Sequence, residues 1–142
     1  MGSITEQLRR HSVALISLIV ALTSLAYNTW RNERTEANRN VRTAGIEFLL
    51  KLGELDRVVF FSQYEMDSER GNPNEGWAYV LTARDLADLT SEPAIGSAHE
   101  LFETWDNRFD ELGSPDRSAA NAISDAIDAA RGDMLSVLAD LD

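Results

Sequence analysis

The sequence predicts an all-α protein, in which one N-terminal transmembrane helix continues into a stalk and a small antiparallel helical bundle follows. Three observations predict this fold. A run of 19 uncharged residues lies near the N-terminus, apolar residues recur at helical spacing through the rest of the chain, and no segment alternates as a half-buried strand does. We divide the chain into an N-terminal tail (1–11), a transmembrane helix (12–30), a polar helical stalk (31–44) and an acidic bundle domain (45–142).

The uncharged segment, residues 12–30, is the predicted membrane span. At about 1.5 Å per residue it is roughly 28 Å long, close to the thickness of a hydrocarbon core. Basic residues and aromatic rings at its two ends are the expected interface anchors: Arg9, Arg10, Tyr27, Trp30, Arg31 and Arg34. Small or polar residues at spacings of three and four form one stripe that suits a helix–helix contact, although such residues are also common in single spans: Ala14, Ser17, Ala21, Ser24 and Asn28.

Two questions about this span stay open in the sequence. Ser24-Leu25-Ala26 has the small residues that signal peptidase needs, so a cleaved signal peptide is an alternative to a retained anchor. The anchor is favoured because no polar stretch separates the apolar run from this site. The arginines that follow the span favour a cytoplasmic over a periplasmic bundle. The short basic N-terminal tail also resists translocation, which opposes this orientation, so the cytoplasmic bundle is only slightly favoured.

Charge is distributed unevenly along the chain. Residues 1–45 contain six arginines and three glutamates, a net charge of +3, whereas residues 46–142 contain seven basic and 21 acidic residues, a net charge of −14. A basic segment beside an apolar run suits a membrane surface, and the acidic remainder would repel nucleic-acid phosphates. We therefore expect a lipid bilayer as a partner and no nucleic acid.

The first bundle helix is expected from about Thr35 to Met66. Its predicted core positions keep heptad spacing: Phe48, Leu52, Leu55 and Val59. Further apolar residues are expected to widen the buried face: Ile46, Leu49, Leu50, Phe60 and Phe61. Residues 67–76 are rich in turn formers and predict a loop.

Three further helical segments are expected after this loop, two short ones and a long last one. One begins at Trp77 and is followed by a helix that Ser97 and Glu100 open as a capping box and that Gly113 closes. The last helix is expected to start with Ser114 as its N-cap and Pro115 as its first residue, and to run to the C-terminus.

No motif predicts catalysis, a metal site or a cofactor. The two histidines, His11 and His99, are isolated in the sequence, and the acidic loop lacks the spacing of a calcium loop. Clustered carboxylates are interpreted as solvated acidic faces: Asp85, Asp88, Glu100, Glu103 and Asp106. We expect no enzymatic activity and no cofactor.

The remaining residues suit an interaction protein. The expected surface contact with a partner is the loop region that holds Arg70, Asn72, Pro73 and Trp77, because tryptophan and arginine dominate many interfaces. Trp77 also suits core packing. The sequence predicts a non-catalytic, membrane-anchored interaction or accessory protein that binds a protein partner or a second copy. Two alternatives are a helical ligand-sensing domain of a membrane receptor system and a cleaved periplasmic helical protein.

Two stretches carry a resemblance to other proteins: YNTWRNERTEANRN and RGNPNEGWAYVLTARDL. There the chain resembles a set of small single-span proteins of proteobacteria to which no activity is assigned. The resemblance implies a single-pass location in the bacterial inner membrane, and it transfers no site residues.

Overall fold

The computed structural model describes residues 4–65, 67 and 69–141, with side chains from His11 onward. Within that part of the chain no strand occurs, and one long apolar N-terminal helix is followed by a smaller helical bundle, which confirms the predicted fold class. The chain divides into two compact units, Met1–Ala37 and Asn38–Asp142. The second unit begins before Gly45, because Val41 and Ala44 already pack against the core.

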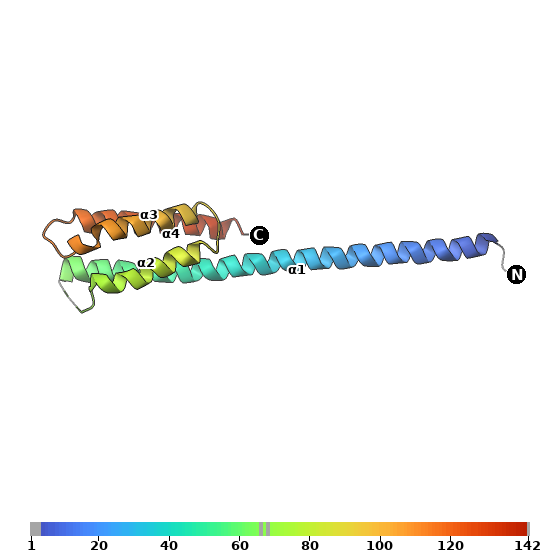
Figure 1. Cartoon of the computed structure of the whole chain (residues 1–142), viewed down its shortest axis with the longest axis horizontal. Coiled ribbons are helices and arrows are strands. Elements are labelled where there is room, and N and C mark those ends of the chain that lie inside the picture. Colours follow the sequence, from blue (N-terminus) through green and yellow to red (C-terminus); the bar gives the residue numbers. More distant parts are fainter. Residues whose placement is uncertain (1–3, 66, 68, 142) are drawn as a thin grey trace. The chain divides into compact units, whose positions relative to one another are not determined.

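Helix α1 extends over Ile4–Phe60 and is followed by a π-helical turn over Phe61–Glu65 (Figure 1). It contains the expected span and the expected stalk as one helix, and residues 4–11, which we expected to be a tail, are helical as well. The helix is uninterrupted because proline, the strongest helix breaker, occurs only from residue 73 onward. The expected last residue of this helix, Met66, lies outside the described residues.

The bundle unit contains the last turns of α1 together with α2 (Pro73–Ala87), α3 (Ala94–Arg108) and α4 (Ser118–Ala139). Successive helices run in opposite directions, and α3 contacts both α2 and α4 (Figure 1). Helix α4 lies antiparallel to α1. The Arg42 guanidinium donates to the Leu141 carbonyl at 3.3 Å, and the Arg131 guanidinium lies 3.9 Å from the Asp56 carboxylate.

The core of the bundle confirms the heptad positions predicted in α1. Phe48, Leu52 and Leu55 are fully buried, and Val59 is 2% exposed. They pack with residues from the other three helices: Val80, Leu101, Trp105, Ile123, Ile127 and Met134. Each fully buried large side chain stabilises the fold by about 1.5–3 kcal/mol relative to an exposed one. The bundle therefore has a continuous core of its own.

The expected widening of the buried face of α1 is wrong for three residues. Ile46, Leu50 and Phe60 are each about half exposed. Ile46 and Leu50 lie two positions before and after Phe48, and at about 100° per residue this turns them roughly 200° away from it around the helix. Leu49 and Phe61 are partly buried.

The start of α2 differs from the prediction, because the loop is shorter than residues 67–76. Pro73 is the first residue of α2, and the Asn72 side chain caps the helix by accepting a hydrogen bond from the Asn74 amide at 3.0 Å. Asparagine at the N-cap followed by proline is a favoured helix start. The first amide of a helix has no partner within the helix, and proline has no amide hydrogen to leave unpaired there.

The predicted starts of α3 and α4 are also wrong. Helix α3 begins at Ala94, where the Glu92 carboxylate accepts from the Gly96 amide at 3.0 Å, and Ser97 is buried within the helix. Helix α4 begins at Ser118, whose amide donates to the Asp116 carboxylate at 2.9 Å. In both places a carboxylate near the first turn, and not the expected serine, accepts from an amide at the start of the helix.

Candidate membrane-spanning helix and bundle surfaces

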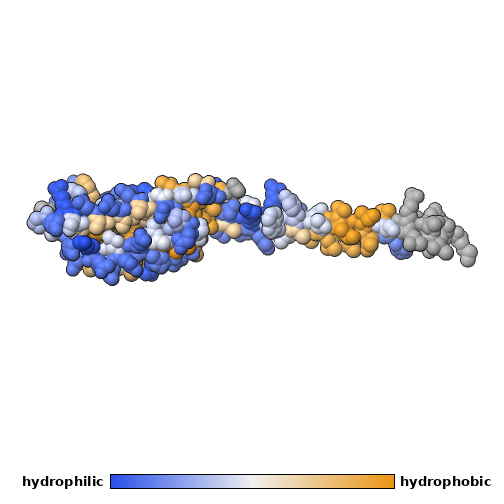
Figure 2. Space-filling model, turned by 90° about the horizontal axis from the view of Figure 1, so that it is seen from above, coloured by the Kyte–Doolittle hydropathy of each residue, from blue (hydrophilic) through white to orange (hydrophobic). Residues whose placement is uncertain are grey.

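The apolar segment of α1 is exposed along its length. Ten large hydrophobic side chains between residues 13 and 30 have exposed fractions of 55% to 64%. Among the described residues, this is the one helix long and apolar enough to cross a membrane, and none of its most apolar window is buried in the protein. Figure 2 shows the corresponding hydrophobic surface next to the grey N-terminal residues.

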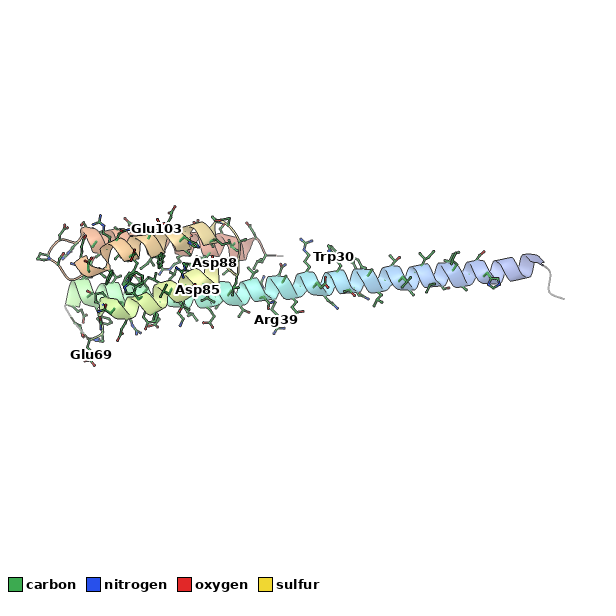
Figure 3. The ribbon with its side chains drawn as sticks, viewed as in Figure 1. Trp30, Arg39, Glu69, Asp85, Asp88 and Glu103 are labelled. Atoms are coloured by element: carbon green, nitrogen blue, oxygen red, sulfur yellow. The ribbon has the colours of Figure 1, made fainter. Side chains whose placement is uncertain are left out.

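The anchors expected after the span lie together on α1. The rings of Tyr27 and Trp30 are 6.2 Å apart, and the Arg34 guanidinium lies 5.8 Å from the centre of the Trp30 ring. Figure 3 shows Trp30 pointing away from the helix axis. Arg31 is exposed as well. An aromatic pair next to arginines is the arrangement found at membrane–water interfaces. The side chains of the other two expected anchors, Arg9 and Arg10, lie outside the described residues.

The predicted small-residue stripe is exposed at all five positions: Ala14, Ser17, Ala21, Ser24 and Asn28. In a bilayer, small side chains at this spacing let two helix backbones approach closely. The structure contains one copy of the helix, and the stripe therefore remains a prediction.

The loop between α1 and α2 is organised by Asp67. Its carboxylate accepts hydrogen bonds from the amides of Glu69 and Arg70, both at 3.0 Å, and from the Arg70 guanidinium at 2.7 Å. The hydrogen bonds from Arg70 lower the pKa of Asp67 below its ordinary value of 3.8, and the same pairing raises the pKa of Arg70. The Arg70 guanidinium also stacks over the Phe61 ring at 4.2 Å. Arg70 is thus engaged within its own loop.

The four residues expected to contact a partner differ in their placement. Arg70 is exposed, whereas Asn72 and Pro73 are partly buried at the start of α2. Asn72 and Pro73 line a hollow of about 440 Å³ at this end of the bundle, together with Ser62, Asp67, Gly71, Leu112 and Gly113. Gly71 is required there, because a Cβ atom would overlap the backbone of Phe61 and Ser62. Loop and π-helical turn are therefore in direct backbone contact.

Trp77 lies at the edge of the core. Its ring packs edge-on against two phenylalanine rings, with centroid distances of 5.9 Å to Phe102 and 5.3 Å to Phe109. The Trp77 side chain is only partly exposed. Behind this group, Trp105 is fully buried and its indole nitrogen has no hydrogen-bond partner among the described residues. Gly76 makes the close packing of α2 on the Trp105 ring possible. Trp77 therefore supports the bundle in addition to any contact it makes with a partner.

The acidic side chains lie on the surface of the bundle helices. Asp85, Asp88 and Glu103, which Figure 3 labels, are exposed. The His99 ring nitrogen Nε2 lies 3.2 Å from the Asp88 carboxylate and links α3 to the end of α2. Among the described residues, no group of three or more histidine, aspartate or glutamate side chains is placed to hold a metal ion.

One surface that the sequence did not indicate is the outward side of α1 in the bundle unit. We call it the α1 seam, and its members are Ile46, Leu50, Gly53, Arg57, Phe60 and Tyr64. All six are exposed. Their own spacing of four and three could have indicated the seam, but the neighbouring core stripe has the same period and masks it in the sequence.

Comparison with known proteins gives no match. No family model, no curated protein and no solved structure matches this chain.

Proposed function

We propose that this chain is a non-catalytic, membrane-anchored interaction protein that presents an acidic helical bundle at the bacterial inner membrane. One observation carries the proposal. The bundle encloses its own core, whereas the uncharged segment of α1 leaves ten large hydrophobic side chains exposed. Burial is worth about 25 cal/mol per Å² of apolar surface, so these side chains are far more stable in hydrocarbon than in water.

The surroundings of the segment support insertion. The Tyr27 and Trp30 pair with Arg34 suits one membrane interface, and the apolar length matches a bilayer. The arginines that follow favour a cytoplasmic bundle. A tethered bundle stays at a high local concentration near its target, which is the advantage of such an accessory protein.

Membrane fractionation of cells that express the chain tests the anchor. We expect the chain to stay in the membrane pellet after alkaline carbonate extraction, with peptides from before Ala26 detectable by mass spectrometry. A soluble chain with a mature N-terminus at Tyr27 would instead establish a cleaved periplasmic protein. In-cell cross-linking followed by detergent purification would then identify what the bundle binds.

One observation favours a second function, a ligand-sensing bundle. The hollow of about 440 Å³ at the end of the bundle combines polar groups from Ser62, Asp67 and Asn72 with two glycines. A sensor of external ligands needs this hollow outside the cytoplasm. Reporter fusions at the C-terminus decide between the two functions, because an active cytoplasmic reporter and an inactive periplasmic one would exclude external sensing.

A further inference from the structure

The α1 seam is a second heptad stripe on a helix whose first heptad stripe is buried. Its six residues follow one another at spacings of four, three, four, three and four. Ile46 is 52% exposed, Leu50 58%, Phe60 48% and Tyr64 50%. The rings of Phe60 and Tyr64 lie 5.5 Å apart, so the apolar surface continues into the π-helical turn. Sustained heptad spacing of exposed apolar residues is the pattern of a coiled-coil face.

We propose that the α1 seam binds the same seam of a second copy of this chain, as a short parallel two-stranded coiled coil. The inference rests on the proposed anchor, because two chains anchored at their N-termini leave the membrane in the same direction. Their α1 helices can then run parallel around a two-fold axis, and each seam residue meets its own counterpart.

Gly53 permits close approach at the middle of the seam. A Cβ atom at Gly53 would have no neighbour within 4 Å, so the protein's own packing does not require this glycine. A glycine in an exposed helix interior costs about 1 kcal/mol relative to alanine. Contact between two helix backbones at this point gives the glycine a role that the single chain lacks.

The seam contains one basic residue with an acidic partner beside it. Arg57 is the one charged residue among the six, and its guanidinium lies 2.9 Å from the Glu54 carboxylate beside the seam. In a parallel pair the two Arg57 side chains meet, and the Glu54 carboxylate beside each of them offsets its charge. A single charged residue at a core position of a coiled coil lowers stability and fixes the register and the number of strands.

The size of the seam favours a second anchored copy over a soluble partner. Its four large apolar side chains expose about half their surface, or roughly 400 Å² per copy, and two copies would bury roughly 800 Å². Stable complexes between freely diffusing proteins bury about 1,200–2,000 Å². A contact this small needs a high effective concentration, which two chains in the same membrane have.

Cysteine cross-linking of the full-length chain in its membrane tests the proposal. The chain contains no cysteine, so one introduced thiol gives an unambiguous result. Leu50→Cys places the thiol in the seam, and Leu89→Cys is the matched control, since Leu89 is similarly exposed at 64% but lies after α2. We expect mild oxidation to convert most of the Leu50→Cys chain into a disulfide-linked dimer and to leave the Leu89→Cys chain monomeric.

A second pair of variants tests close approach at Gly53. Gly53 and Gly132 are both exposed, and an added Cβ atom at either would meet no neighbouring residue within 4 Å, so Gly53→Leu and Gly132→Leu both add a side chain toward open space on the single chain. In the Leu50→Cys background, we expect Gly53→Leu to abolish the dimer and Gly132→Leu to leave it unchanged.

Three results would overturn the inference: equal cross-linking of the Leu50→Cys and Leu89→Cys chains, no cross-linking of either, or a Leu50→Cys product that contains a different protein. Fractionation of the same cells reports on the anchor separately. A soluble chain would refute the proposed function, whereas a membrane-bound chain that stays monomeric would refute only the pairing of the seams.

Discussion

The side chain of Gln63 holds the connection between α3 and α4 at Gly113. Its carbonyl oxygen accepts a hydrogen bond from the Gly113 amide at 3.1 Å, and its amide nitrogen donates to the Ser114 carbonyl at 2.8 Å. Gln63 lies in the π-helical turn and is 7% exposed. Gly113 has a φ of +82°, a conformation that glycine adopts without strain. One buried amide thus joins segments 50 residues apart in the sequence.

Replacing Gln63 by leucine should destabilise the bundle. Gln63→Leu removes the hydrogen-bond partner of the Gly113 amide and that of the Ser114 carbonyl, and each lost hydrogen bond costs about 0.5–1.5 kcal/mol. Urea denaturation in detergent, followed by tryptophan fluorescence, would measure the loss. Asn121→Leu, at an exposed position of α4, should change the free energy of unfolding by less than about 0.5 kcal/mol. Equal stability of the two variants would contradict the role of the Gln63 side chain.

Two glycines in helices should respond to alanine in opposite directions. At Gly76 a Cβ atom would overlap the Trp105 ring, so Gly76→Ala should destabilise the bundle by about 1–3 kcal/mol through overpacking. At Gly132 an added Cβ atom would meet no neighbouring residue within 4 Å, so Gly132→Ala should stabilise α4 by about 0.5–1 kcal/mol. The same denaturation experiment compares the two variants. Stabilisation by Gly76→Ala would show that α2 can move away from Trp105 without loss.

The long-range periodicity of the sequence predicted the helices well. Phe48, Leu52, Leu55 and Val59 are buried as expected, because a heptad repeat places all four on one side of a helix. Apolar spacing alone could not show that Ile46 and Leu50 lie outside the buried side of the helix. Which side of a helix is covered depends on where the neighbouring helices lie, and apolar character alone does not specify it.

Helix starts were predicted poorly, because several nearby side chains compete to cap each start. The expected caps Ser97 and Ser114 are serines, but the structure uses Glu92 and Asp116, which accept from the helix amides instead. The hollow at the end of the bundle was also beyond sequence reasoning. It depends on the close backbone contact of Gly71 with the π-helical turn, and no local pattern announces a π-helical turn.

Acid should weaken the loop between α1 and α2 through Asp67. The hydrogen bonds from Arg70 lower the pKa of Asp67 in the folded protein, so the ionised carboxylate stabilises the fold at pH values above its ordinary pKa of 3.8. This stabilisation should be lost as the pH falls through the lowered folded-state pKa. Asp67→Asn should therefore be less stable than the unmodified chain at neutral pH, and the difference should shrink below about pH 4.

Denaturation midpoints measured between pH 2 and pH 7 would test this dependence. Arg70→Ala supplies the control, since removing the guanidinium should reduce the effect of Asp67→Asn at neutral pH. A difference between Asp67→Asn and the unmodified chain that stays constant down to pH 2 would contradict the assignment.

A charge in the middle of the apolar segment should prevent its insertion. Leu18 is 56% exposed and lies between residues that are all uncharged, so Leu18→Arg would place an arginine near the centre of the bilayer. This costs about 2.5–3.5 kcal/mol on scales of membrane insertion, and the variant should be depleted from the carbonate-resistant membrane fraction. Leu135→Arg is the matched control, because Leu135 is 51% exposed on α4 and the bundle tolerates a charge there. Equal membrane retention of both variants would mean that residues 12–30 do not span the bilayer.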